Sequence, residues 1–337
     1  MKTVLAASAL MFLAGAGFAG ECVGENLIAA LPAEDRAWIR DRAEAVPYHQ
    51  GILWRAEKGD AWISIVGTYH FDHAMHPDTV ARLQPDLAAA DRLLVEMGPE
   101  EEAQLQAAML SDPTLIMDPT GPTLPERLSE PQWQEVSAAM EARGVPAVMA
   151  SRMRPWYLAM LMGFSPCAMQ QLTQESALLN GLDKRLMAEA ETIGLPVEAL
   201  EPWDTVIQMF GNLTPQEEID MIVYSLPMAG YADDYTTTMD DAYAAGDIWQ
   251  IWEFGRLDGY RNSGLTEGEV DEMLAEAEQI LMHDRNRAWI DPMTGAANMA
   301  AASGKGIVAA FGALHLPGEK GVLRLLEQEG WTIERVE

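Results

Sequence analysis

The chain has 337 residues, of which 49% are hydrophobic, and its formal net charge at pH 7 is −30. This hydrophobic content is enough to bury a core, so the charge belongs to a solvated surface rather than to a disordered chain. An acidic surface repels phosphate backbones and anionic lipid, which argues against nucleic acid as a partner. We interpret the acidity as a solubilising coat, with attraction of cations as the alternative.

The first nineteen residues are typical of a secretory signal peptide. A single charge at Lys2 precedes an apolar run that ends in Gly17-Phe18-Ala19. The run of about fifteen residues is too short for a stable membrane span. We therefore expect a signal peptide over residues 1–19, a mature domain over residues 20–337, and a periplasmic or secreted protein.

Export exposes both cysteines, Cys22 and Cys167, to an oxidising compartment. A disulfide between them is the natural prediction. Two isolated buried thiols are the alternative.

Short apolar runs at residues 62–66 and 92–96 predict buried strands near the start of the chain. A helical pattern over residues 78–90, interrupted at Pro85, connects them. At the other end, runs at residues 307–311 and 331–333 flank a helical pattern over residues 318–330. Each end thus forms a strand-helix-strand unit.

The middle of the chain, residues 99–302, is mostly helical. Residues 112–125, rich in Pro, Asp and Thr, predict a surface loop, and one further strand is expected at residues 197–200. Helical patterns cover residues 181–193, 214–225 and 269–290. The sequence therefore predicts an α/β fold: a central, mostly parallel sheet from the N- and C-terminal parts, with a large helical insertion.

Two strands run into the same motif, Gly-x-x-His, which ends at His70 near the start and at His315 near the end. Glu96 ends a third strand. The carboxyl ends of parallel strands share one edge, where ligands bind. Two His and one Glu are also a common set of metal ligands in hydrolases. The alternative is that the histidines are hydrogen-bonded turn residues and that Glu96 caps the following helix.

The paired motifs, Glu96 and the dipeptide Arg285-Asn286 together resemble the TraB/PrgY/GumN family. Gly181-Leu182-Asp183, Leu200-Glu201-Pro202 and the segment from Gly312 to Gly318 extend the resemblance over nearly the whole mature chain. The resemblance implies an α/β fold similar to erythromycin-esterase-like and ChaN-like proteins. It also implies kinship to the Tiki metalloproteases, whose activity is attributed to the two histidines and the glutamate.

Carried over residue by residue, the resemblance makes His70, Glu96 and His315 ligands or near-ligands of a divalent metal, with zinc, manganese and cobalt all plausible. The metal-bound water would be the nucleophile. Without a metal, Glu96 or a histidine would act as general base. Arg285 and Asn286 would hold an oxyanion or a substrate carboxylate; an ordinary helix end is the alternative.

Beyond His70, the histidines His73 and His76 follow at intervals of three residues. We interpret them as part of a solvated loop rather than a second metal cluster, with His73 as a reserve ligand. The tryptophans, among them Trp249, Trp252 and Trp289, predict core filling rather than a carbohydrate or peptide groove.

Two functional hypotheses follow. The first is an exported metal-dependent hydrolase, possibly a peptidase, that acts on a peptide or small-molecule substrate. The second is a non-catalytic peptide- or glycan-binding or accessory protein of polysaccharide or pheromone pathways. The sequence gives no indication of the oligomeric state.

Overall fold

The computed structural model describes residues 24–167, 169, 180–211 and 213–336. The predicted signal peptide and Cys22 lie outside the described residues, so the signal peptide and the disulfide to Cys167 stay predictions. No helix within these ranges is both long and apolar enough to cross a membrane.

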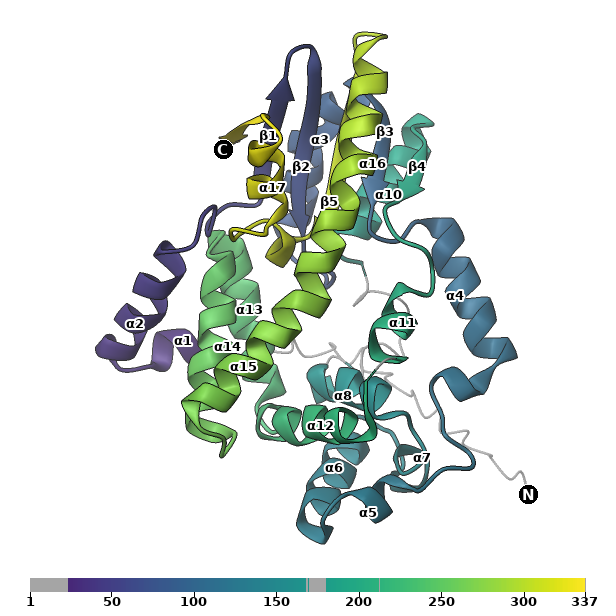
Figure 1. Ribbon diagram of the computed structural model, residues 1–337, viewed down its shortest axis with the longest axis vertical. Helices are drawn as coiled ribbons and strands as arrows, with labels where there is room; N and C mark the ends of the chain where they lie inside the picture. The colour runs from purple at the N-terminus through teal and green to yellow at the C-terminus, as the bar shows by residue number, and fades with distance from the viewer. Residues whose placement is uncertain (1–23, 168, 170–179, 212, 337) are drawn as a thin grey trace, which may run out of the picture.

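The architecture is a mixed six-stranded sheet with helices around it (Figure 1). Its strand order is β4-β3-β5-β2-β1-β6. Four neighbouring strands, β4, β3, β5 and β2, run parallel, while β1 is antiparallel to both β2 and β6. The strands are β1 (Leu53–Lys58), β2 (Ala61–Thr68), β3 (Ala90–Val95), β4 (Val197–Ala199), β5 (Gly306–Gly312) and β6 (Thr332–Arg335).

The prediction of an α/β fold with a mostly parallel sheet is confirmed, and the five predicted strands all form. Strand β1 was not predicted, because Arg55, Glu57 and Lys58 interrupt its apolar side chains. Its position explains this pattern: β1 lies near the sheet margin, and the charged ends of Glu57 and Lys58 are exposed to water. Interior strands such as β2 are instead buried on both faces and read as one apolar run.

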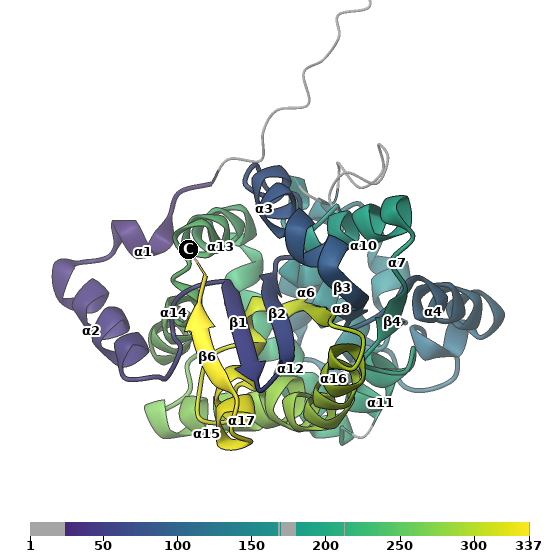
Figure 2. The ribbon, with the colours of Figure 1, turned by 90° about the horizontal axis from the view of Figure 1, so that it is seen from above.

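Two helices cover each face of the sheet (Figure 2). On one face, α16 (Asp284–Ala301) and α17 (Val322–Gln328) bury Trp289, Met293 and Leu326 against Ile65 and Ala309. On the other, α3 (His76–Ala89) and α10 (Leu182–Ile193) bury leucines against the opposite side chains of the same strands. Burying a side chain of this size contributes about 1.5–3 kcal/mol, so these layers hold the sheet rigid. Helix α3 continues through Pro85, where an interruption was expected.

Most of the remaining helices lie below the carboxyl ends of the parallel strands (Figure 1). Several of them share a separate apolar core that includes Leu124, Met140, Leu158 and Ile222. The helices of this layer are α4 (Pro99–Ser111), α5 (Leu124–Arg127), α6 (Glu130–Ala142), α7 (Ala147–Ala150), α8 (Pro155–Gly163), α11 (Thr205–Gly211), α12 (Pro215–Ala229), α13 (Ala232–Ala245), α14 (Ile248–Asn262) and α15 (Glu267–Glu278). The predicted surface loop at residues 112–125 contains the short 3₁₀ turn η1 (Pro113–Leu115), an isolated β-bridge from Met117 to Met153 and the start of α5. At the N-terminal end, α1 (Leu27–Ala30) and α2 (Ala33–Glu44) pack against α13 and α14.

One long helical run crosses from this layer to the sheet. It consists of α15, the π-helical turn η2 (Gln279–His283) and α16, joined without a break. A π turn holds one extra residue per turn and often lies at a functional site. Arg285 is the second residue after η2, where the run passes the carboxyl ends of the strands.

Candidate functional site

His70 lies two residues beyond the end of β2, and α10 holds it in place. Leu182 donates its backbone N–H to the carbonyl of Tyr69 at 3.0 Å, which brings the first turn of α10 against the motif. Only glycine fits at position 181, because a Cβ there would lie 2.5 Å from the carbonyl of His70. This contact places Oδ1 of Asp183 3.4 Å from Nδ1 of His70 and leaves the Nε2 side of the ring toward the site.

Glu96 follows β3 directly, and both of its carboxylate oxygens have donors. Oε1 accepts the backbone N–H of Gly312 at 2.5 Å, and Oε2 accepts Nη2–H of Arg285 at 2.6 Å. Its side chain is 18% exposed. The carboxylate therefore lies deep in the site, fixed from β5 on one side and from α16 on the other.

His315 closes the 3₁₀ turn η3 (Ala313–His315) after β5, and it is buried rather than open to a pocket. The centroid of its ring lies 4.5 Å from that of Trp289, which covers it from α16. Its Nδ1–H donates to Oδ1 of Asn286 at 2.6 Å, and Nδ2 of Asn286 donates to the carbonyl of Lys320 at 3.0 Å. These partners leave the lone pair on Nε2 of His315.

The three predicted residues come from adjacent parallel strands and meet around Gly312. A Cβ at Gly312 would lie 3.2 Å from Oε1 of Glu96, 3.6 Å from Cδ2 of His315 and 3.9 Å from Nε2 of His70. The distance between Nε2 of His315 and Oε1 of Glu96 is 3.9 Å. The structure thus brings His70, Glu96 and His315 to one edge of the sheet, and a side chain at position 312 would obstruct the space between them.

Arg285 connects this cluster to the end of β4. Its Nη1–H donates to Nε2 of His315 at 3.2 Å, and Nε–H and Nη2–H donate to the carboxylate of Glu201 at 2.6 and 2.9 Å. Trp289 donates its indole N–H to Glu201 at 3.0 Å. One guanidinium thus contacts Glu96, Glu201 and His315 at once, which places Arg285 at the centre of the site rather than at an ordinary helix end.

The two imidazoles have opposite pKa shifts. Burial lowers the pKa of His315 to about 4, with the positive charge of Arg285 acting in the same direction. Around His70, desolvation alone would lower the pKa, but the hydrogen bond to Asp183 and the charge of Glu96 raise it to about 9. Water reaches 58% of the His70 side chain, so these carboxylates are partly screened. At neutral pH, His315 is uncharged and His70 carries a proton.

The pKa values of Glu96 and Glu201 are also shifted in opposite directions. Burial alone would raise the pKa of Glu96, but the charges of protonated His315, Arg285 and His70 and the N–H of Gly312 lower it to about 2. Desolvation raises the pKa of Glu201 above its ordinary value despite the hydrogen bond and charge of Arg285. The surroundings of Glu96 therefore favour its ionised form, whereas burial acts against that form at Glu201.

The residue types fit a divalent metal ion. Each imidazole engages Nδ1 with an outer partner, Asp183 or Asn286, which is how metal-binding histidines are commonly held. As the side chains lie here, however, no three His, Cys, Asp or Glu residues of the described ranges are close enough together to hold an ion. The guanidinium of Arg285 occupies the Nε2 lone pair of His315, so metal binding there requires Arg285 to withdraw.

His73 and His76 support the loop after β2. Nδ1 of His73 accepts the backbone N–H of Met75 at 3.2 Å, and Nε2–H of the buried His76 donates to the carbonyl of Phe71 at 2.9 Å. Asn286, predicted to hold substrate, is 1% exposed and instead orients His315.

Sequence reasoning did not single out Asp183 and Glu201 as site residues. Both were noted only within the resemblance. Glu201 had a usable signal, because it follows a predicted strand just as Glu96 does, and its backbone N–H donates to the carbonyl of Glu96 at 3.2 Å. The sequence holds no such signal for Asp183, because only the packing of α10 against Tyr69 and His70 brings Asp183 close to the ring of His70. Trp289, interpreted as core filling, is indeed fully buried, yet it also contacts Glu201 and His315.

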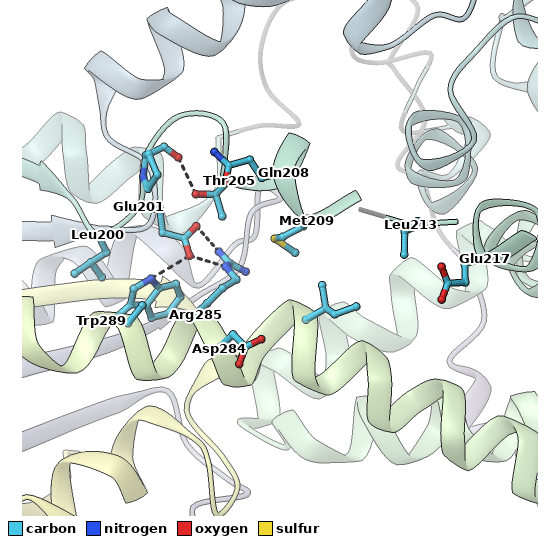
Figure 3. A pocket seen from close by; sticks show the side chains of 13 residues that line it. Leu200, Glu201, Thr205, Gln208, Met209, Leu213, Glu217, Asp284, Arg285 and Trp289 are labelled. Atoms are coloured by element: carbon cyan, nitrogen blue, oxygen red, sulfur yellow. Dashed lines mark hydrogen bonds and ion pairs between the residues drawn. The ribbon is translucent and has the colours of Figure 1, made fainter. Parts of the chain in front are cut away.

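A cavity of about 540 Å³ adjoins the cluster, between α11 and the run from η2 into α16 (Figure 3). Figure 3 shows Arg285, Glu201 and Trp289 together at one end of it and Glu217 at the other. Arg285 lines this cavity and also contacts Glu96 and His315. The cavity and the cluster therefore share one residue.

Fold and site together define an α/β protein with two imidazoles, ionised carboxylates and an arginine at the carboxyl edge of its parallel strands. The model of the TraB/PrgY/gumN family matches residues 52–335. The chain belongs to this family, which confirms the resemblance found in the sequence.

Two similar proteins are the uncharacterized protein YbaP of Escherichia coli (strain K12) and its namesake of Shigella flexneri. Each is 26% identical over 297 residues, which cover 83% of this chain and 98% of the relative. No solved structure matches the chain.

Proposed function

We propose that this protein is a hydrolase that cleaves an amide or ester bond at the cluster of His70, Glu96, His315 and Arg285. One observation carries the proposal: the two imidazoles flank an ionised carboxylate in environments that move their pKa values apart. Titratable groups separated in this way are the usual sign of an acid and base assignment.

In the proposed reaction, a water molecule beside Glu96 attacks the carbonyl carbon of the substrate. Glu96 accepts a proton from the water, and a bond forms between the water oxygen and that carbon. The bond to the leaving nitrogen or oxygen then breaks, and His70, which is protonated and accessible, donates a proton to the leaving atom. Arg285 stabilises the negative charge that develops on the carbonyl oxygen.

The remaining residues keep these groups oriented. Asp183 fixes His70 through Nδ1, while Asn286 fixes the tautomer of His315, whose Nε2 accepts an N–H of Arg285. Glu201 and Trp289 hold the other side of the guanidinium. All five N–H groups of Arg285 have acceptors, the fifth being the carbonyl of Leu281, so Arg285 exchanges one of these contacts for the substrate oxygen.

We further propose a metal-dependent form of the same activity. His70, Glu96 and His315 would hold the divalent ion, which would polarise the substrate carbonyl and lower the pKa of a bound water. From the predicted signal peptide we propose that the enzyme acts in the periplasm or outside the cell, where its substrate would be a peptide or a small molecule.

A screen of peptide and ester substrates tests the proposal, using the mature protein with chelator and with added zinc, manganese or cobalt. His70→Ala should abolish turnover, because it removes the proton donor from an exposed position without opening the core. His49→Ala is the matched control, since His49 lies outside the cluster and its ring contacts the carbonyl of Val46. Equal turnover by His70→Ala and the parent would refute the assignment. No turnover by the parent under any of these conditions would favour a non-catalytic binding protein.

A further inference from the structure

The cavity beside the cluster has apolar walls. These are formed by Leu200, Met209, Leu213, Ile280, Ala288 and Trp289. Polar and charged residues complete the lining: Glu201, Thr205, Gln208, Glu217, Asp284 and Arg285. A pocket of several hundred cubic ångströms binds the apolar parts of small molecules along its apolar walls and orients them through such polar groups. The walls therefore suit a hydrocarbon chain or an apolar side chain.

The charged side chains that line the cavity carry an excess of negative charge. The carboxylate of Glu201 is neutralised by Arg285 at the inner end. Asp284 and Glu217 are exposed carboxylates in the lining, and each accepts a hydrogen bond from a neutral donor: Asp284 from Nε2 of Gln279 at 2.5 Å, and Glu217 from the backbone N–H of Thr214 at 2.6 Å. Two negative charges thus remain in the lining, that of Asp284 beside Arg285 and that of Glu217 at the opposite end (Figure 3).

These two features select for a particular kind of ligand. An apolar chain gains from burial against the walls. A cation on the same chain is attracted by Asp284 and Glu217, whereas an anion is repelled by them. A neutral chain gains only from burial against the apolar walls.

We propose that this cavity is a substrate subsite that binds an apolar chain ending in a cationic group, such as an alkylammonium side chain. The inference rests on the proposed function, because it places the bound chain next to the cluster: Arg285 lines the cavity at the end where it contacts Glu96 and His315. The apolar part of the substrate lies along Met209 and Trp289, and its cation lies near Glu217, at the end of the cavity opposite Arg285 (Figure 3).

Binding can be tested without turnover. Ligand-observed NMR titrations would compare hexylammonium, hexanol and hexanoate, which share one chain length and differ in charge. We expect hexylammonium to bind about fivefold more tightly than hexanol, as a partly exposed ion pair implies, and hexanoate to bind most weakly.

One variant fills the cavity. Ala288 is exposed on α16 and lines the cavity, so Ala288→Phe should block it without disturbing the core and should weaken binding of hexylammonium and hexanol by at least about tenfold. Ala275→Phe is the matched control, because Ala275 is exposed on the same helical run and is not part of the lining. It should bind both probes like the parent.

A second variant removes the charge. The double change Asp284→Asn and Glu217→Gln should bring hexylammonium affinity down to that of hexanol while leaving hexanol affinity unchanged. The double change Glu272→Gln and Glu276→Gln removes two exposed charges from α15 outside the cavity, and it controls for the net charge of the protein.

The possible outcomes separate the two proposals. If the parent does not bind hexylammonium, if Ala288→Phe binds it unchanged, or if hexanoate binds as well as hexylammonium, the subsite is wrong even where hydrolysis is observed. If the probes bind as expected and no substrate is ever hydrolysed, the subsite stands and the proposed function fails.

Discussion

Nη2 of Arg285 lies 2.6 Å from Oε2 of Glu96, although the two residues come from the first and last thirds of the chain. The same guanidinium binds Glu201, so a single cation compensates two buried carboxylates. A charged group removed from water is strongly destabilising when its partner is lost. This relationship therefore joins the stability of the sheet edge to the chemistry of the site.

Arg285→Met should lower the free energy of unfolding by about 3–5 kcal/mol, because it leaves Glu96 and Glu201 buried without a counter-charge. Adding Glu201→Gln to this variant should restore part of the loss. Urea unfolding of the parent, the single variant and the double variant measures both effects. Equal stability of parent and Arg285→Met would show that water already compensates the two carboxylates.

Asp183→Asn should lower the pKa of His70, because the substitution removes the carboxylate that holds the ring in its protonated form. NMR titration of the histidine ring protons measures this directly. The raised pKa also has a consequence for stability: the contribution of protonated His70 is complete below about pH 6.5 and is lost as the pH rises toward 9. The stability difference between parent and Asp183→Asn should therefore shrink over that interval. A difference that stays constant from pH 6 to pH 9 would contradict the role given to Asp183.

Local sequence patterns predict most of the sheet that carries the site. The strands that end near His70, Glu96 and His315 are buried on both faces, so their side chains form continuous apolar runs that sequence alone reveals. Gly67 and Gly312 stand out because glycine permits close approach: a Cβ at Gly67 would lie 2.6 Å from Leu316, which belongs to the segment after the second motif. The repeated motif thus encodes contact between the two ends of the chain.

Other features of the site depend on contacts between segments far apart in the sequence, and no periodic pattern of residues predicts them. The burial of His315 follows from the position of α16 over β5, where Trp289 covers the ring. The bridge from Arg285 to Glu201 requires the π turn η2 and the edge strand β4 to come together. Sequence patterns identify each segment but not the distance between them.

Acid should destabilise the protein partly through His315. Its pKa of about 4 lies below the ordinary value of 6.5, so the unfolded chain takes up a proton before the folded protein does as the pH falls. Stability from this group is complete above about pH 6.5 and is lost between pH 6.5 and pH 4. His315→Asn retains a donor toward Asn286 but does not titrate, so it should be less stable than the parent at pH 8 and lose less stability on acidification. Thermal unfolding between pH 4 and pH 8 checks this, and parallel losses in both proteins would contradict it.

The predicted disulfide between Cys22 and Cys167 should stabilise the mature protein by about 4–5 kcal/mol, because it would close a long loop in the unfolded chain. Peptide mapping under non-reducing conditions should recover the two cysteines as one linked fragment. Reduction, or Cys167→Ser, should then lower the free energy of unfolding by about the same amount, measured by urea unfolding. Two titratable thiols in the protein purified under oxidising conditions would end the prediction.

The last prediction concerns the competition between Arg285 and a metal ion. Both need the same atoms, Nε2 of His315 and a carboxylate oxygen of Glu96, and both are cations. If His70, Glu96 and His315 bind a divalent ion, removal of the guanidinium should strengthen that binding, so Arg285→Met should bind zinc, manganese or cobalt at least about tenfold more tightly than the parent. Affinity in both proteins should rise with pH toward 9, because the ion must displace the proton held by His70. Calorimetric titrations at pH 6 and pH 8 measure both effects, and the number of protons released should increase at the lower pH.

His49→Ala serves as the control for histidines outside the cluster. Equal affinity of parent and Arg285→Met, with no effect of His70→Ala, would place any bound metal elsewhere and leave the acid and base chemistry to the protein's own side chains.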